Sequence, residues 1–292
     1  MKVHLNSRVV DRSEAMVSPF DRGFLFGDGI YEGLRAFDGV VIGAEAHVDR
    51  MQEGLNECRI PWDASPIPAL TAELLAANDL RDAFIYWQVT RGTPLPGRAV
   101  RSRVADGPVH PTVFGYCVPL PGIDGCREVA TVRARTVEDL RWLRGHVKSI
   151  SLLGNVLGAV DAAEAGVDDA VFVRDGLVGE ATSTNIVLAV PDGAGGVELV
   201  TPSIRSAPIL AGVTRKILLD LGLIHDRAVR VEELRAAREV MLLGTISMIK
   251  SVVELDGRPV GAGVPGPLAR GLLARYLEFI RESIAGAIGV RA

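Results

Sequence analysis

The sequence predicts a mixed α/β protein with two domains, and three observations support that fold class. The chain has 292 residues, enough for about two domains at roughly 150 residues each. Hydrophobic residues make up 48% of the chain and charged residues 23%, a composition typical of globular proteins. Strand-like and helix-like segments alternate until Pro119-Leu120-Pro121-Gly122 interrupts them. We therefore expect an N-terminal domain over residues 1–120 and a C-terminal domain over residues 121–292.

The N-terminal domain is predicted to combine a sheet with two helices. Asp38-Gly39 forms a two-residue hairpin turn between strands at 29–37 and 40–42. Apolar residues recur every three to four positions from Val48 to Cys58, which predicts a helix over 46–59. The other expected elements are strands at 2–5, 9–10, 83–90 and 113–118 and a helix at 68–77.

The C-terminal half repeats the mixture of strands and helices. A helix at 152–165 is expected to end at Gly166, a residue type that commonly terminates helices. Asp175-Gly176 predicts a hairpin between strands at 170–174 and 177–179. Further helices are expected at 212–221 and 268–284, and further strands at 128–133, 185–190, 198–200, 239–243 and 249–255.

Composition excludes several classes of function. The net charge of −4 and the pI of about 5.8 argue against a nucleic-acid binder, which usually carries a basic patch. No run approaches the roughly 18 apolar residues of a membrane span, and the first residues lack the apolar region of a signal peptide. Cys58, Cys117 and Cys126 fit neither a disulfide framework nor a metal site. We expect a cytoplasmic protein without a structural metal.

Seven short motifs follow one another between residues 26 and 247. Together they resemble the class IV (fold type IV) pyridoxal-phosphate aminotransferases, most closely the D-amino-acid aminotransferase branch. That resemblance implies a smaller N-terminal α/β domain, a larger C-terminal pseudo-barrel domain carrying the cofactor lysine, a cofactor in the cleft between them, and a homodimer. The motifs are Phe26-Gly27-Asp28-Gly29-Ile30-Tyr31-Glu32, His47-Val48-Asp49-Arg50, Val89-Thr90-Arg91-Gly92, Lys148-Ser149-Ile150-Ser151-Leu152-Leu153-Gly154-Asn155, Gly179-Glu180-Ala181-Thr182-Ser183-Thr184-Asn185, Gly212-Val213-Thr214-Arg215 and Gly244-Thr245-Ile246-Ser247.

The resemblance implies a role for each matching residue in holding pyridoxal 5′-phosphate. Lys148 would hold the cofactor as an internal aldimine and then move the substrate proton. Glu180 would face the pyridine nitrogen and keep it protonated. Arg50 would bind the phosphate through its planar fork. The other expected cofactor contacts are the helix start at Val213 and Thr214, the turn at Thr245 and Ile246, and the supporting residues Thr184 and Asn185.

Substrate recognition departs from the family pattern. Tyr31 matches a tyrosine at the mouth of the substrate pocket. The D-amino-acid enzymes bind the substrate carboxylate with an Arg-x-His pair, but here Arg98 is followed by Val100 in place of the histidine. Residues i and i+4 share a face of a strand, so Arg35 is expected to point the same way as Tyr31. Our hypothesis is that Arg35 and Arg98 together bind the α-carboxylate of a D-amino acid or a 2-oxo acid such as pyruvate or 2-oxoglutarate.

Several alternatives remain open at this stage. Gly33-Leu34-Arg35-Ala36-Phe37 is more typical of branched-chain L-amino-acid aminotransferases. A lyase of the aminodeoxychorismate type would use the same lysine, and a primary (R)-amine is a further possible substrate. A non-catalytic cofactor binder is disfavoured because Lys148 and Glu180 are both present. A nucleotide-binding domain is rejected because the chain has neither a Rossmann glycine fingerprint nor a Walker sequence.

Overall fold

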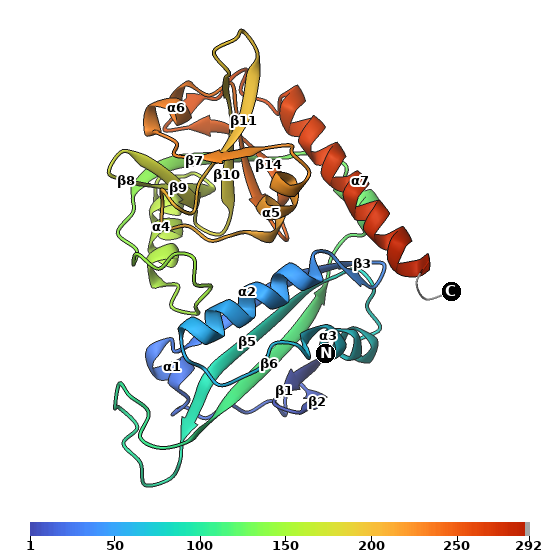
Figure 1. Cartoon of the computed structure of the whole chain (residues 1–292), viewed down its shortest axis with the longest axis vertical. Helices are drawn as coiled ribbons and strands as arrows, with labels where there is room; N and C mark the ends of the chain where they lie inside the picture. Colours follow the sequence, from blue (N-terminus) through green and yellow to red (C-terminus); the bar gives the residue numbers. More distant parts are fainter. Residues whose placement is uncertain (290–292) are drawn as a thin grey trace. The chain divides into compact units, whose positions relative to one another are not determined.

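The computed structural model describes residues 1–289 and divides into two compact units (Figure 1). Unit 1 comprises Met1–Gly122 and Val147–Leu152, and unit 2 comprises Ile123–His146 and the chain from Leu153 onward. The main boundary thus follows Gly122, two residues beyond the expected position. Residues 147–152, which include Lys148, group with unit 1 rather than with the C-terminal part, because they pair with a strand of unit 1.

Unit 1 is built on a six-stranded antiparallel sheet. The strand order is β2-β1-β6-β5-β3-β4, and the β3–β5 ladder runs from Gly29 to Ala36 without a register shift. Two longer helices pack on the sheet (Figure 1). The elements are β1 (Lys2–Leu5), β2 (Arg8–Asp11), α1 (Arg22–Phe26), β3 (Gly29–Phe37), β4 (Val40–Val41), α2 (Ala44–Glu57), α3 (Ile67–Ala77), β5 (Ala83–Pro94) and β6 (Val109–Pro119).

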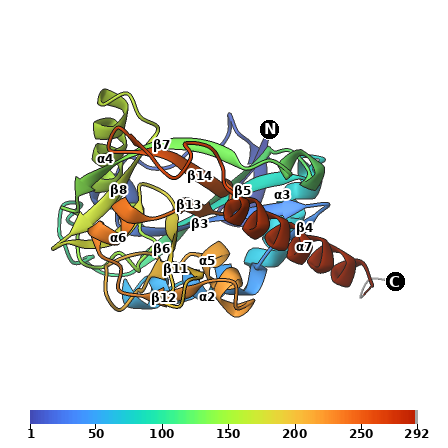
Figure 2. The same ribbon diagram turned by 90° about the horizontal axis from the view of Figure 1, so that it is seen from above.

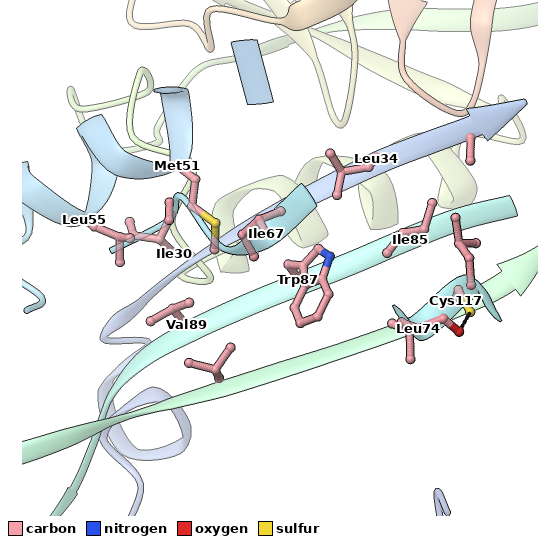
Figure 3. Close-up of a cluster of buried hydrophobic side chains, with 14 of the residues drawn as sticks. Ile30, Leu34, Met51, Leu55, Ile67, Leu74, Ile85, Trp87, Val89 and Cys117 are labelled. Carbon is pink, nitrogen blue, oxygen red and sulfur yellow. Dashed lines mark hydrogen bonds between the residues drawn. The ribbon is translucent and has the colours of Figure 1, made fainter. Parts of the chain in front are cut away.

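The two faces of this sheet have different environments. One face carries the apolar core, in which Ile30, Leu34 and Trp87 meet Met51 and Leu55 of α2 (Figure 3). The Trp87 ring N–H donates to the Thr71 hydroxyl at 2.9 Å, so this large side chain is buried without leaving its donor unpaired. The opposite face carries a row of stacked, half-buried aromatic rings from Tyr31, Tyr86 and Tyr116.

Unit 2 is built on a nine-stranded mixed sheet. Its order is β12-β11-β10-β13-β14-β7-β8-β9, with β15 paired to β14. The strand β9 contacts β10 and β11, so the sheet curls back on itself as a half-barrel. The elements are a 3₁₀ turn (Ile123–Cys126), β7 (Ala130–Glu138), α4 (Leu153–Glu164), β8 (Asp169–Arg174), β9 (Leu177–Ala181), β10 (Asn185–Pro191), β11 (Val197–Pro202), α5 (Val213–Asp220), β12 (His225–Arg227), α6 (Val231–Ala236), β13 (Glu239–Gly244), β14 (Met248–Leu255), β15 (Arg258–Pro259) and α7 (Pro267–Gly289).

The interior of the half-barrel forms the core of unit 2. Alternating branched residues of β10 and β13, such as Ile186, Leu188, Val240 and Leu242, are fully buried there, the pattern expected where one strand face meets a core. The long helix α7 packs on β13 and β14 (Figure 2). No helix within residues 1–289 is long and apolar enough to cross a membrane.

The predicted mixed α/β class is confirmed, and most expected strands and helices are present. The exceptions are short. The helices α1 and α6 and the strands β12 and β15 were not expected, because two to six residues are too few to show a periodic pattern.

Candidate functional site

Lys148 is placed by a short extended segment that pairs with the beginning of β3. The Tyr31 N–H donates to the Lys148 carbonyl at 3.0 Å, and the Ile150 N–H donates to the Gly29 carbonyl at 3.1 Å. The Lys148 side chain is half-buried, and its Nζ lies 4.2 Å from the centre of the Tyr31 ring. This distance is within the range of a cation–π contact. The structure therefore brings together Lys148 and Tyr31, two residues that the sequence predicts for the site.

On the opposite face of β3, Glu32 joins two residues of α2 in a buried network. The Arg50 Nε and Nη2 donate to the two Glu32 carboxylate oxygens at 2.7 and 2.8 Å. The His47 Nδ1 lies 2.7 Å from Glu32 Oε2. Burial alone would raise the pKa of Glu32, but the charge of Arg50 and the hydrogen bonds from His47 and Arg50 hold that pKa well below its usual range. Burial lowers the pKa of His47 despite the neighbouring carboxylate.

This network defines the position of Arg50. Because its side chain is held by a two-point contact with Glu32, the plane of the guanidinium is fixed before any ligand binds. Arg50 is also largely buried, unlike an ordinary solvated helix charge.

Arg35 and Arg98 lie at opposite ends of β5. Arg35 pairs in register with Phe84 near the beginning of that strand, and its Nη2 donates to the Pro121 carbonyl at 3.0 Å. Its guanidinium carbon lies 4.5 Å from the centre of the Phe37 ring. Arg98 lies in the loop after Pro94, half-exposed and 3.5 Å from Asp106.

The ten positions from Phe84 to Pro94 span roughly 33 Å at about 3.3 Å per residue. The strand parity that placed Arg35 on the Tyr31 face holds, since the ladder is regular. The structure does not bring Arg35 and Arg98 together within one chain, because strand parity says nothing about distance along the neighbouring strand.

Glu180 of β9 is the centre of a second charged network, in unit 2. The Arg141 Nη1 donates to its Oε1 at 2.9 Å. The other oxygen, Oε2, accepts from the Asn185 amide at 3.2 Å and from the Leu210 N–H at 3.0 Å. Arg141 is itself held by Asp139, with both Nε and Nη2 donating to that carboxylate at 3.0 and 3.1 Å. The carboxylate of Glu180 is thus fixed in orientation.

The beginning of α5 lies next to this carboxylate. Gly212 precedes the helix, and a Cβ at Gly212 would collide with the Asn185 amide oxygen. The N–H groups of Val213 and Thr214, in the first turn, have no acceptor within the helix. Asn185 therefore links the Glu180 carboxylate to a helix start that suits an anion.

The turn Gly244–Ser247 lies at the same edge of the sheet, since Asn185 pairs in register with Leu243. Any side chain at Gly244 would meet Thr184 and Ser247. The hydroxyl oxygens of Thr184 and Ser247 are buried without a hydrogen-bond partner. Buried polar atoms normally have a partner, so this edge has the properties of a site built for a polar ligand.

Comparisons with known proteins identify the family. The model of the class IV amino-transferases matches residues 29–255. The chain belongs to the class IV aminotransferases. It is 34% identical to a D-alanine aminotransferase of Bacillus licheniformis, over 99% of this chain and 100% of the relative. It is also 34% identical to a putative branched-chain-amino-acid aminotransferase of Methanocaldococcus jannaschii, over 95% and 96% of the two chains.

Solved structures agree with this class IV assignment. A branched-chain aminotransferase from Thermoproteus uzoniensis, crystallised with norvaline, superposes with a TM-score of 0.80 at 26% identity and covers 94% of this chain and 93% of its own. The predicted family and fold type are therefore confirmed. The protein is a pyridoxal-phosphate-dependent aminotransferase with the two-domain fold type IV architecture.

The class IV residues present here fit that cofactor. In unit 1, Lys148 is a partly buried primary amine. In unit 2, one sheet edge carries an oriented carboxylate, a helix start and two unpartnered hydroxyls. Each of these groups is of a kind that can bind a phosphorylated pyridine. Within residues 1–289 no group of three or more histidine, cysteine or acidic side chains forms a metal site.

Three charged residues of these networks, Glu32, Arg141 and Asp139, were not assigned a role from the sequence. Glu32 stands in the motif beside Tyr31, and strand parity would have placed it toward the helix that carries His47 and Arg50. Arg141 contacts a carboxylate 39 residues away, and no local pattern marks it.

Proposed function

We propose that this enzyme transfers an amino group between a D-amino acid and a 2-oxo acid such as pyruvate or 2-oxoglutarate. The observation that carries this proposal is the 34% identity to a D-alanine aminotransferase along 99% of the chain. The pairing of Lys148 with Tyr31 at the beginning of β3 supports it, because it places an amine beside an aromatic residue that can contact the substrate.

The cofactor contacts we propose follow the two networks. Bound pyridoxal phosphate supplies a carbon that accepts the amino group and a ring that withdraws electrons from the substrate α-carbon. Lys148 is the group that carries the cofactor and removes and returns the α-proton. Glu180 holds a proton on the ring nitrogen, because an oriented carboxylate stabilises a neighbouring cation.

We propose the following contacts with the phosphate. Arg50 donates from its fixed guanidinium, while Val213 and Thr214 donate from the first turn of α5 and Thr245 and Ile246 from the turn after β13. Thr184 and Asn185 support Glu180 and the cofactor from the same sheet edge. The unpartnered hydroxyls of Thr184 and Ser247 support the view that this edge takes a polar ligand.

We further propose that the enzyme acts as a homodimer in the cytoplasm. The helix α4 exposes an apolar stripe of Leu153, Val156, Leu157 and Val160, with exposed fractions from 43% to 70%. A second copy is the occupant we infer for this stripe. All three cysteines are free thiols, as is usual in a reducing compartment. Light scattering on the purified protein tests the dimer, and a monomer would contradict it.

The test of the main proposal is spectroscopic and kinetic. The purified protein should show a visible absorbance band of bound pyridoxal phosphate that changes when D-alanine is added and returns when 2-oxoglutarate is added. The specificity constant kcat/KM should be larger for D-alanine than for L-valine or L-leucine. Lys148→Arg should abolish both spectral changes, whereas the exposed Lys216→Arg should keep them.

A branched-chain L-amino-acid aminotransferase is the second candidate, favoured by the Methanocaldococcus jannaschii relative and by Gly33-Leu34-Arg35. A higher kcat/KM for L-leucine than for D-alanine would establish it in place of the D-specific proposal. Release of pyruvate from aminodeoxychorismate without an amino acceptor would instead indicate a lyase. Amino transfer from a primary (R)-amine is a side activity that the same assay measures.

A further inference from the structure

The loop 95–108, between β5 and β6, is attached to the rest of unit 1 by a buried side chain, Arg22 of α1. The Arg22 Nη1 donates to the Ser102 carbonyl and its Nη2 to the Arg103 carbonyl, both at 2.7 Å. Its Nε donates to Asp28 Oδ2 at 2.8 Å. The donors of a guanidinium have fixed relative directions, so these three bonds fix the loop backbone relative to Asp28.

Asp28 is in turn held by a second arginine. The Arg91 Nε and Nη2 donate to the Asp28 carboxylate at 2.8 and 3.0 Å, and Arg91 also donates to the carbonyls of Cys58 and Arg59 after α2. Burial would raise the pKa of Asp28, but the hydrogen bonds from Arg91 and Arg22 hold it below its usual range. Asp28 stands directly before β3, whose third residue is Tyr31. The bonds through Arg22 and Asp28 therefore fix the position of the loop relative to the strand that carries Tyr31.

The arginines in the loop are not equivalent. Arg101 donates to the Leu25 carbonyl at 3.4 Å, and its guanidinium carbon lies 4.8 Å from the centre of the Phe26 ring, which Arg22 contacts at the same distance. Arg101 therefore belongs to the attachment on α1. Arg98 is half-exposed and contacts Asp106 of the same loop, so its guanidinium can reach a ligand without disturbing the attachment.

We propose that Arg22 is a positioning residue for substrate binding. By holding the carbonyls of Ser102 and Arg103 it keeps the loop in the conformation in which Arg98 binds a substrate carboxylate. The bonds go to the loop backbone and leave its side chains available. A 14-residue connection without secondary structure would otherwise sample many conformations. The link to substrate rests on the function proposed above, whereas the hold on the loop does not.

Limited trypsin digestion of the holoenzyme tests whether Arg22 fixes the loop 95–108, and it needs no measurement of activity. Trypsin cleaves after arginine and must bind the carbonyl oxygen of that arginine in its own oxyanion hole. In the folded protein the Arg103 carbonyl instead accepts a hydrogen bond from Arg22. Arg22→Met should increase cleavage after Arg98, Arg101 and Arg103 by about tenfold or more, since local opening governs proteolysis. Arg81→Met, at an exposed arginine that pairs with Asp38 on the surface, should digest like the wild type.

Arg22→Lys keeps the charge and loses the fork, so it should give an intermediate cleavage rate. It also carries the test if the methionine variant does not fold, as judged by circular dichroism. Unchanged loop cleavage in a folded Arg22 variant would overturn the proposed hold, and so would a general increase at arginines elsewhere in the chain.

Steady-state kinetics test the link to substrate. We expect the KM for D-alanine to rise about tenfold in Arg22→Lys, while kcat stays within about twofold and the affinity for pyridoxal phosphate is unchanged. Faster loop cleavage with a wild-type KM would overturn the positioning role. A wild-type protein without transamination would overturn the proposed function instead, and the digestion would still decide whether Arg22 holds the loop.

Discussion

Two buried glutamates, one in each unit, are both held by an arginine, but their surroundings differ. Glu32 is about 1% exposed and faces the charged fork of Arg50 together with His47. Glu180 is 7% exposed; the Arg141 Nη1 donates to its Oε1, and two neutral donors, the Asn185 amide and the Leu210 N–H, donate to its Oε2. A carboxylate enclosed by its own ion pair stabilises the fold and fixes its partner. A carboxylate that also accepts from neutral donors, as Glu180 does, fits the role proposed for it toward a bound cofactor.

Replacing Glu32 should have the largest effect on stability. Glu32→Gln leaves the Arg50 charge buried without its anion, which typically costs about 3–5 kcal/mol. We expect this loss in the free energy of unfolding from denaturant titration at neutral pH. Glu53→Gln, on the exposed side of the same helix, should change it by less than about 0.5 kcal/mol. Equal stabilities of the two variants would contradict the assignment of Glu32 to the fold.

The same variant should change the acid stability. The folded-state pKa of Glu32 is lowered, so the stabilisation is fully present above the unfolded-state value of about 4.5 and is lost as the pH falls. The stability difference between wild type and Glu32→Gln should therefore shrink steadily below about pH 4.5. A difference that stays constant down to pH 3 would show that the lost contact is not ionic.

Glu180→Gln should affect catalysis more than stability. An amide at this position cannot hold a proton on the cofactor nitrogen, and the loss of one such electrostatic contact typically lowers kcat by about 10²–10³-fold. Asn185 and the Leu210 N–H can still donate to the amide oxygen, so the melting temperature should fall by only a few degrees. Glu278→Gln, in an exposed pair with Arg275, is the matched control. Wild-type kcat in Glu180→Gln would remove Glu180 from the proposed chemistry.

Arg141→Met should produce a smaller effect that identifies its role. Without the guanidinium, Glu180 becomes a stronger base, so the pH dependence of kcat should shift while the cofactor still binds. We expect kcat at neutral pH to change by about tenfold or less. The sharper measurement is the pH profile, because loss of a merely structural contact would lower kcat equally at every pH.

Asn185→Ala should have the smallest effect. It removes the amide bonds to Glu180 and to the Leu210 carbonyl, each worth about 1 kcal/mol. Calorimetry should show a modest decrease in Tm, and kcat should fall severalfold because Glu180 loses orientation. An effect on kcat as large as that of Glu180→Gln would mean that Asn185 contacts the cofactor itself.

The local patterns in the sequence were enough to predict individual strands and helices, but not the contacts between distant parts of the chain. The strand 29–37 was predicted with its observed bounds, since the Asp38-Gly39 hairpin turn marks its end. The alternation of side chains along the strand correctly placed Arg35 on the face of Tyr31. The distance along β5 between Arg35 and the Arg98 loop depends on how β3 pairs with β5, which neither segment shows by itself. The Arg141–Glu180 contact and the pairing of residues 147–150 with β3 join distant parts of the chain, which no periodicity reveals.

The pairing of residues 147–152 with unit 1 also affects how the protein is made. A ribosome that has released residues 1–122 has not yet supplied all of unit 1, because the segment that carries Lys148 follows residues 123–146 of unit 2. All six strands of the N-terminal sheet lie within residues 2–119, but unit 1 is complete only when that segment has been made. A fragment ending at Gly122 would lack both the strand partner of Tyr31 and the reactive amine, so the two units cannot be separated by a single cut without losing the proposed catalytic lysine.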